Sequence, residues 1–544
     1  MVRSGSKFLL LFLGLLAFLF ACMRLDRQAD RQSQNILPTV SSTKIAAPES
    51  PTLPPPTLPA ALATQFQPMP TSSPPLPTPS STPIPAITLS VPVEWRAQIL
   101  DKLEQLNQEN SQYTWRLVGD DQADVSLVND ASGSIIRETV YALAVPFTEE
   151  FETLSMDQAE GILRDGHESI TILPWMEMRA DQKALRIDGF GPADSGYPLR
   201  DAWSLVAGTL HQDAANALAS LLREPETDSV VHLSAVGDIS LDRTLGEVLQ
   251  QGDLEYPFSA VSDQLQEADI SVGNLESALG DSGVPQRKSY TFRAPPEAAA
   301  SLAMAGFDLV SLANNHGMDY GEEALIQAVD LLTKQGLSTI GAGENDSAAY
   351  APQIIESNGL RIAFFGYANV PIESGGFDVA SWTAGENKPG IAWAEPQIVA
   401  ENIAAIRDQV DLIVVLLHSG IEYLPTPSEA QQSIGHAAID AGADLVIGHH
   451  AHILQGIEYY KDGVIIYGTG NFAFDIIGPP ESVIYHIWLD RDGVREIAIE
   501  PVIVQAGGKP RLADTSEGDQ IRKQVYQLTK QLNVHQASAQ RDPE

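Results

Sequence analysis

The feature that most constrains the fold is a pattern that recurs across residues 229–513. Each repeat has a short apolar run, then polar residues with glycine, then a segment with helical spacing. Uninterrupted apolar runs of this length are typical of strands that are covered on both faces. The pattern therefore predicts a layered α/β domain. The predicted strands include residues 230–236, 268–272, 307–312, 337–340, 361–365, 412–417, 444–447 and 464–467, and the predicted helices are 296–305, 322–334, 394–409 and 428–441.

The flanking regions give coarser predictions. After residue 480, the runs 483–489 and 496–504 flank Asp490-Arg491-Asp492-Gly493, which predicts an antiparallel hairpin. Residues 514–544 predict one helix, at 520–532, and a frayed tail.

Upstream, residues 94–226 alternate helical and strand-like stretches, which predicts a smaller α/β accessory domain. Helices are expected at 94–106, 157–163 and 199–222, and strands at 113–118, 125–128 and 140–145. Residues 141–147 and 154–158 faintly resemble a lobe of periplasmic substrate-binding proteins. A solute-binding role and a spacer role are therefore both open for this region.

The N-terminal residues predict a targeting signal rather than a folded element. Arg3 and Lys7 precede a 13-residue apolar run, 8–20, which is shorter than the ~20 residues that a membrane-spanning helix needs. Leu19-Phe20-Ala21-Cys22 resembles the lipobox of bacterial lipoproteins, in which the cysteine is lipidated. We therefore expect residues 1–22 to be a lipoprotein-type signal peptide that anchors the chain to a membrane outside the cytoplasm. The alternatives are an ordinary cleaved signal or an uncleaved anchor helix.

Residues 23–93 predict a disordered stalk. Fourteen of the 36 prolines lie between residues 48 and 85, and no charged residue occurs between Glu49 and Glu94. A segment so rich in proline, serine and threonine cannot build a core and favours extended polyproline geometry.

Composition excludes several classes of function. The net charge of −38 argues against nucleic acid as a partner, because holding a phosphate backbone needs a basic surface. Cys22 is the single cysteine, which excludes an intramolecular disulfide, a cysteine-based zinc site and an iron–sulfur cluster.

Polar side chains gather just after the predicted strands. Ligand-binding groups of α/β folds collect at the carboxyl ends of strands, and imidazole, carboxylate and amide oxygen are ligands of Zn, Mn or Fe. Taken singly, such an aspartate is more often a helix cap, and such a histidine is more often a core residue. Their joint occurrence at successive strand ends favours a metal centre. The groups are Asp238, Asn274, Glu276, Asn314, Asn315, His316, Asp319, His418, Glu422, His449, His450, His452 and Asn471.

The order of these motifs carries a resemblance. Gly-Asp-x4-Arg at 237–243, Asn-Leu-Glu at 274–276, Asn-Asn-His at 314–316, His-x-Gly-x-Glu at 418–422, Gly-His-His-x-His at 448–452 and Gly-Asn-Phe at 470–472 resemble the CapA family of poly-γ-glutamate capsule proteins. That family is related to calcineurin-like metallophosphoesterases. The resemblance covers about residues 233–475 and implies a four-layer α/β/β/α sandwich over residues 229–513, preceded by the smaller α/β domain.

The resemblance also implies roles for single residues. One or two divalent ions (Mn, Zn or Fe) would be held by Asp238, Glu276, Asn315, His418, His450 and His452. His316 would be the general acid, Asp319 would orient it, and Arg243 would neutralise the transferred group unless it is simply an exposed residue at a helix start. Asn274, Asn314, Glu422, His449 and Asn471 would surround the ligands.

One departure from the superfamily pattern concerns the first motif. Ser240 stands where metallophosphoesterases have the histidine of Asp-x-His, which leaves occupancy by two metals open.

The implied function is that of a surface-anchored protein with a metal-dependent phosphoesterase-type domain that acts in capsule or poly-γ-glutamate synthesis or export. The alternative is a non-catalytic component that binds or exports an anionic polymer. The expected partners are a phosphoester or an anionic polymer, the membrane through the N-terminal lipid, and capsule synthesis or export proteins. An acidic chain would repel an acidic polymer unless metals or arginines mediate the contact.

Overall fold

A computed structural model describes residues 85–108, 113–119, 123–223, 229–373, 375–475 and 478–539, with side chains to residue 533. The expected signal peptide, Cys22 and the expected stalk up to residue 84 lie outside the described residues. Within the described part, no helix is long and apolar enough to cross a membrane.

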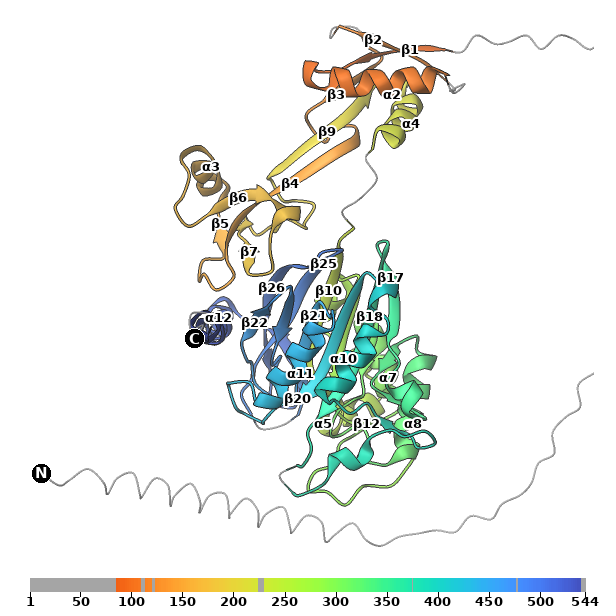
Figure 1. The fold of residues 1–544 in the computed structure, drawn as a ribbon, viewed down its shortest axis with the longest axis vertical. Helices are drawn as coiled ribbons and strands as arrows, with labels where there is room; N and C mark the ends of the chain where they lie inside the picture. Colours follow the sequence, from red (N-terminus) through yellow and green to blue (C-terminus); the bar gives the residue numbers. More distant parts are fainter. Residues whose placement is uncertain are drawn as a thin grey trace, which may run out of the picture. The chain divides into compact units, whose positions relative to one another are not determined.

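Residues 86–222 form a mixed sheet with helices beside it (Figure 1). The strand order is β2-β1-β3-β9-β4-β6, and β7 also pairs with β4. Strand β1 falls inside the segment expected to be a stalk, so regular structure begins earlier than predicted. The elements are β1 (Ala86–Ser90), α2 (Arg96–Gln108), β2 (Thr114–Val118), β3 (Val125–Val128), β4 (Ser134–Pro146), β5 (Thr153–Leu154), α3 (Met156–Asp165), β6 (Thr171–Pro174), β7 (Gln182–Ala184), β8 (Arg186–Ile187), β9 (Arg200–Ala207) and α4 (Gln212–Leu222).

The helix expected over residues 199–222 is wrong in its first half. Residues 200–207 are strand β9, which pairs with both β3 and β4, and only α4 is helical. Trp203 and Leu205 are buried in a core that also contains Trp95, whose ring lies 5.2 Å from that of Trp203. This tertiary burial outweighs the local helical pattern.

Residues 231–512 contain two larger sheets. The first has the order β15-β14-β11-β10-β25-β26-β27, with β24 beside β10, and the second has the order β17-β18-β20-β21-β23-β22. Strands β25 and β26 form the predicted antiparallel hairpin. The strands are β10 (Val231–Ser240), β11 (Ile270–Leu275), β14 (Leu309–Ser311), β15 (Ser338–Ile340), β17 (Gln353–Ser357), β18 (Leu360–Asn369), β20 (Leu412–Ser419), β21 (Leu445–His449), β22 (Ile457–Tyr460), β23 (Gly463–Ile466), β24 (Asn471–Phe474), β25 (Glu481–Asp490), β26 (Gly493–Val504) and β27 (Pro510–Leu512).

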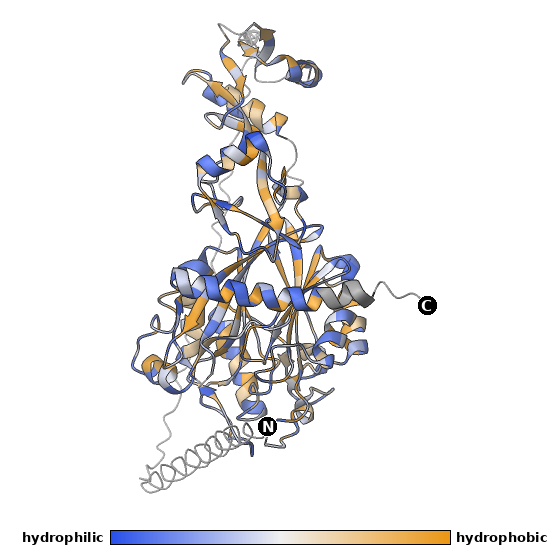
Figure 2. Cartoon of the chain, turned by 90° about the vertical axis from the view of Figure 1, so that its left-hand side faces the viewer, coloured by the Kyte–Doolittle hydropathy of each residue, from blue (hydrophilic) through white to orange (hydrophobic). Residues whose placement is uncertain are grey.

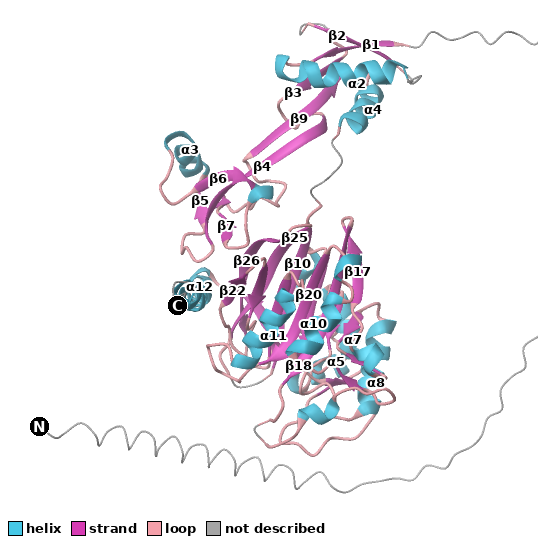
Figure 3. Cartoon of the chain, viewed as in Figure 1, coloured by secondary structure: helices cyan, strands magenta, loops and turns pink. Residues whose placement is uncertain are grey.

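Helices accompany both sheets, as Figure 3 shows. The predicted α/β class is therefore confirmed, with several sheets. The helices are α5 (Arg243–Gln250), α6 (Ser262–Gln266), α7 (Glu297–Ala305), α8 (Glu322–Lys334), α9 (Asp346–Ala349), α10 (Pro396–Ala404), α11 (Glu429–Asp440) and α12 (Thr515–Ala539), and short paired strands lie between them at β12 (Ala278–Leu279), β13 (Arg293–Ala294), β16 (Ala342–Gly343) and β19 (Gly390–Ile391).

Alternation along the strands separates two cores. Leu412, Val414 and Leu416 of β20 share a core with residues of the first sheet such as Leu233. The alternate residues of β20, such as Val415, belong to a different core, which contains residues of α10 and α11. Figure 2 shows that α12, the helix that leads to the C-terminus, carries many polar residues.

Strand register brings the polar strand ends together. Parallel pairing places Asp238 of β10 opposite Asn274 of β11 and also opposite Asn471 of β24. In the second sheet, parallel pairing places His418 of β20 opposite His449 of β21.

Candidate metal centre

Asp238 connects the strand ends of the two sheets. Its completely buried carboxylate accepts a hydrogen bond from Asn274 Nδ2 at Oδ1 (2.8 Å) and one from the backbone N–H of His450 at Oδ2 (3.1 Å). His452 Nδ1 lies 3.4 Å from the same Oδ2. Burial raises the pKa of Asp238, but hydrogen bonding to His452 and the charges of His449 and His452 outweigh it, so the pKa falls below its usual value. Asp238 is therefore held as a carboxylate.

Glu276 follows β11 and has an unusual environment. It is completely buried, and neither carboxylate oxygen has a hydrogen-bond partner among the described residues. His418 Nε2 and His452 Nε2 lie 3.6 and 3.8 Å from Oε1. Burial and the neighbouring charge of Asp238 raise the pKa of Glu276 well above its ordinary value. A buried carboxylate without a donor is costly, and a bound cation would remove that cost.

His418 lies between amide and carboxylate groups. Its Nε2 is 2.7 Å from Asn315 Oδ1, and its Nδ1 is 3.1 Å from Asn274 Nδ2. Burial, reinforced by the neighbouring His450, lowers the pKa of His418 well below its usual value. A neutral imidazole is the form that binds metals.

The turn after β21 supplies the remaining histidines. His450 and His452 have positive φ angles, 87° and 55°, in the left-handed region that costs energy for residues other than glycine. His452 Nδ1 lies 2.8 Å from Asn471 Oδ1, which leaves Nε2 directed toward Glu276. Burial together with His452 lowers the pKa of His450 to about 3. For His452, burial lowers the pKa, but Glu276 and Asp238 reverse this and raise it to about 10.

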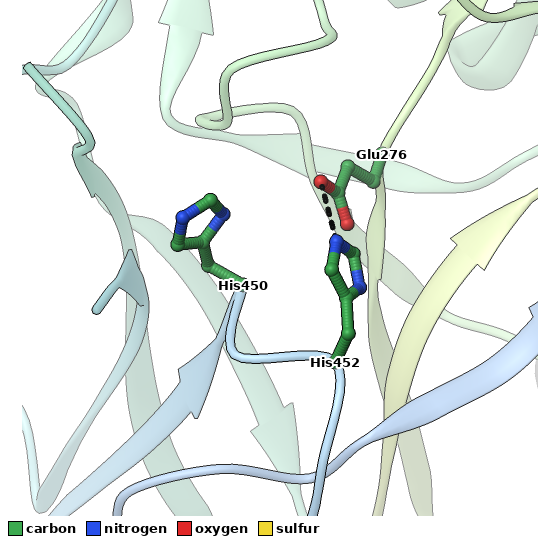
Figure 4. A group of neighbouring side chains, drawn as sticks. All are labelled: Glu276, His450 and His452. Carbon is green, nitrogen blue, oxygen red and sulfur yellow. Dashed lines mark ion pairs between the residues drawn. The ribbon is translucent and has the colours of Figure 1, made fainter. Parts of the chain in front are cut away.

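Two groups of side chains have the composition and spacing of metal ligands. One is Glu276, His450 and His452 (Figure 4), and the other is Asp238, Glu276 and His418. Within each group the ligand atoms lie within 4.8 Å of one another. Glu276 belongs to both, and Asn315 Oδ1 adjoins the second through His418. Mixed imidazole and carboxylate donors suit Zn, Mn or Fe, so the residues present fit the implied ions.

A chain of amides lies behind these groups. Asn314 Nδ2 donates to Asn274 Oδ1 at 3.0 Å, and Asn274 in turn donates to Asp238. His449 points elsewhere: its Nε2 lies 3.1 Å from the carbonyl oxygen of Val236, and its Nδ1 has no hydrogen-bond partner in the part of the chain that the structure describes. Hydrogen-bonded amides such as Asn274, which donates to the candidate metal ligand Asp238 and is itself held by Asn314, keep that ligand in its orientation.

His316 and Asp319 form a buried pair. His316 Nδ1 lies 2.6 Å from Asp319 Oδ2, which also accepts a hydrogen bond from the backbone N–H of Phe292 at 2.6 Å. The Phe292 ring stacks on the imidazole at 4.1 Å. Burial and the nearby Lys288 lower the pKa of His316 well below its usual value, whereas burial raises the pKa of Asp319 to about 7.

Three positions noted in the sequence, Arg243, Ser240 and Glu422, lie outside the two groups of candidate metal ligands. The Arg243 side chain is 45% exposed, donates to the carbonyl oxygen of Asp475 at 2.7 Å, and lies 5.0 Å from the Phe292 ring centre. Ser240 donates to Asp242 Oδ1 at 3.0 Å rather than to any of the ligand groups. Glu422 is exposed, and its negative charge contributes to raising the pKa values of Glu276 and His452.

Sequence reasoning missed Lys288, Phe292 and Glu373. Lys288 forms ion pairs with Asp319 and Glu373, and Glu373 accepts a hydrogen bond from Asn315 Nδ2 at 3.0 Å. These residues lie in loops with no periodic pattern. The one signal in the sequence was the Arg287-Lys288 pair in an otherwise acidic chain.

Comparison with known proteins matches the central part of the chain. The family model described as "Bacterial capsule synthesis protein PGA_cap" matches residues 232–476. "Capsule biosynthesis protein CapA" of Bacillus anthracis is 30% identical over 307 residues, which cover 55% of this chain and 73% of that protein. "PGA biosynthesis protein CapA" of Bacillus subtilis (strain 168) is 31% identical over 318 residues, which cover 56% and 80%.

More distant proteins also match. A "Probable polyglutamine synthesis accessory protein" of Mycobacterium tuberculosis is 28% identical over 256 residues, covering 45% of this chain and 66% of that protein. A crystal structure of a hypothetical protein from Thermus thermophilus covers 50% of this chain and 97% of its own, with 15% identity and a TM-score of 0.32, which is too distant to inform function.

The chain is an α/β protein with a buried carboxylate–histidine centre, and the family that it matches lies in the metallophosphoesterase-like superfamily. Within it, the chain belongs to the bacterial capsule synthesis protein family PGA_cap, the CapA family.

Proposed function

We propose that residues 229–513 form a metal-dependent phosphoesterase-type hydrolase that acts in capsule or poly-γ-glutamate synthesis or export. The observation that carries this proposal is the Glu276 carboxylate, which is buried between His418 and His452 without a hydrogen-bond donor among the described residues. The names of the Bacillus relatives support the biological setting. We further propose that a lipid on Cys22 holds the chain at a membrane outside the cytoplasm.

The proposal includes a four-layer α/β/β/α arrangement. Three apolar cores support it: one contains side chains of both large sheets, one contains residues of the first sheet with α5, α7 and α8, and one contains residues of the second sheet with α10 and α11. Two sheets that share one core and carry helices on their other faces form such a sandwich.

Different side chains of the site would have different roles in hydrolysis. Bound divalent ions would polarise the phosphoryl group and lower the pKa of a water molecule. Asp319 occupies Nδ1 of His316, so Nε2 is the ring nitrogen left for proton transfer. Because the pKa of His316 is lowered, the ring must take up a proton at Nε2 before it can protonate a leaving oxygen. Arg243 brings a half-exposed positive charge beside the Phe292 ring that stacks on His316, suited to the charge of a phosphoryl group.

A second candidate function has its own supporting observation. Ser240 replaces the first-motif histidine and is engaged with Asp242, which removes one expected metal ligand. A site with a single weakly held ion would suit the binding or export of an anionic polymer without hydrolysis. In that case the ion would bridge acidic protein and acidic polymer.

The test combines metal analysis with a phosphoester assay on the purified full-length protein. We expect one or two Mn, Zn or Fe ions per chain, and hydrolysis of p-nitrophenyl phosphate or its diester that stops with chelator. The Glu276→Ala and His418→Ala variants should lose both metal and activity. His436→Ala is the matched control, because His436 pairs with Glu458 outside this centre. Metal content unchanged in the site variants would refute the proposal, and chelator-sensitive polymer binding without hydrolysis would favour the second function.

A further inference from the structure

Lys288 is a completely buried cation beside the candidate centre. Its side chain is 0% exposed, and Nζ lies 2.7 Å from Asp319 Oδ1 and 2.5 Å from Glu373 Oε1. Nζ also donates a hydrogen bond to the backbone carbonyl oxygen of Asn315 at 2.5 Å. One ammonium thus connects two carboxylates and a backbone oxygen.

The surroundings of Lys288 hold its ammonium in place. The ring centres of Trp382 and Phe377 lie 4.9 and 5.6 Å from Nζ. Aromatic faces attract a cation, more strongly where water is excluded. A buried ion pair of this kind adds little to the stability of the fold by itself. Its role is therefore sought in the groups that the two carboxylates contact.

The first carboxylate leads to His316. Asp319 presents Oδ1 to Lys288 and Oδ2 to His316 Nδ1, 2.6 Å away. The Lys288 ammonium therefore fixes the rotation of the carboxylate that in turn fixes the plane of the imidazole. The free nitrogen, Nε2, is aimed by this arrangement.

The second carboxylate leads to Asn315. Glu373 Oε1 receives both the Lys288 ammonium and Asn315 Nδ2, at 3.0 Å. Because the amide nitrogen of Asn315 is held by Glu373, its Oδ1 is turned toward His418 Nε2, 2.7 Å away. A flip of this amide would present N–H groups to the metal centre instead of an oxygen.

We propose that Lys288 is a positioning residue that sets the proton-donating imidazole of His316 and the oxygen of the Asn315 amide at the same time, through Asp319 and Glu373. This inference rests on the proposed function. It couples the proton-transfer side of the site to the metal side through one ammonium.

The test compares Lys288→Met, Lys288→Arg and the control Lys461→Met, which removes a lysine from an exposed ion pair with Asp440. We expect Lys288→Met to lower kcat for p-nitrophenyl phosphate by about 10²-fold, in the range that general acid catalysis supplies. KM should change by less than about threefold, because the Lys288 side chain is completely buried against Asp319 and Glu373 and has no surface left for a substrate. Lys288→Arg should restore part of kcat, because a guanidinium can still pair with both carboxylates.

A second readout needs no turnover. Co²⁺ is added to the metal-free protein, and its visible absorption band is recorded with its affinity. Glu373→Ala, which frees the Asn315 amide, should shift the band and weaken Co²⁺ binding by about 10–100-fold, as loss of an outer hydrogen-bond partner does. Lys288→Met should shift the band in the same way, and Lys461→Met should leave it unchanged.

The outcomes separate the two levels of the proposal. A wild-type protein that binds no Co²⁺ and hydrolyses nothing contradicts the proposed function. If the wild type is active and Lys288→Met keeps kcat within about threefold with an unaltered Co²⁺ band, the positioning role alone is overturned. If Lys288→Met does not fold, the Glu373→Ala band decides, and an unshifted band overturns the inference.

Discussion

The Glu276→Gln substitution makes a sharp prediction because metal should change its effect on stability. In metal-free protein the wild-type carboxylate is buried beside Asp238 without a donor from the described residues. A buried polar group without a partner costs about 1–3 kcal/mol, and more when it is charged. A neutral amide of the same shape avoids the part that comes from the charge and its repulsion by Asp238. The metal-free variant should therefore be more stable at pH 8, with a melting temperature higher by about 2–12 °C at about 2–4 °C per kcal/mol.

The difference in stability between the metal-free wild type and Glu276→Gln should also depend on pH. The pKa of Glu276 is raised in the folded protein, so its stabilising contribution is present below its unfolded pKa and is lost as the pH rises through the folded value. The two metal-free proteins should therefore have similar stability near pH 4 and diverge with rising pH.

Metal should shift the balance of stability toward the wild type by about 2.3 kcal/mol. A free ion concentration of about 100 times Kd stabilises the wild type by about 2.7 kcal/mol. If loss of the shared ligand weakens binding about 100-fold, the same ion concentration adds only about 0.4 kcal/mol to the variant. Melting curves with chelator and with Mn²⁺ measure both effects, and Glu323→Gln, an exposed carboxylate on α8, is the control. An equal rise with Mn²⁺ in the wild type and Glu276→Gln would refute the reasoning that Glu276 is a shared ligand.

Three further predictions concern other parts of the chain. Burial lowers the pKa of His486 to about 3, so the stability that the neutral ring contributes is present above about pH 6.5 and is lost as the pH falls toward 3. Urea unfolding should show the free energy of unfolding falling by about 2 kcal/mol between about pH 6.5 and 5. The His486→Phe variant should show a smaller fall. Trp175 Nε1 donates to buried Glu496 at 2.6 Å, so Trp175→Phe should cost about 1–3 kcal/mol in the same assay, and no change would contradict this. Cys22→Ser should release the protein from the membrane fraction and stop lipid labelling; unchanged partitioning would exclude the lipid anchor.

The positions of the candidate metal ligands could be predicted because each follows an apolar run that can be recognised in the sequence. The apolar run 412–417 became the buried strand β20, and His418 follows it directly. Parallel pairing then fixed which strand ends meet, so Asp238 faces Asn274 and His418 faces His449. Apolar periodicity and the carboxyl-end rule are sufficient for this part of the site.

The network around Lys288 could not be predicted in the same way. Lys288 lies in a loop, and its partners Asp319 and Glu373 come from loops farther along the chain. Such contacts depend on how loops pack, which leaves no periodic trace in the sequence. The failure at residues 200–207 has a related cause, because pairing of β9 with two neighbours decided its structure against the local pattern.

The central claim is that this buried centre holds a divalent metal. Anomalous diffraction from crystals of the protein grown with Mn²⁺ or Zn²⁺ tests it most directly. We predict an anomalous peak beside Glu276 within about 2.0–2.3 Å of its carboxylate and of a histidine nitrogen. Crystals that show no peak there, with Glu276 hydrogen-bonded to protein or water alone, would contradict the claim.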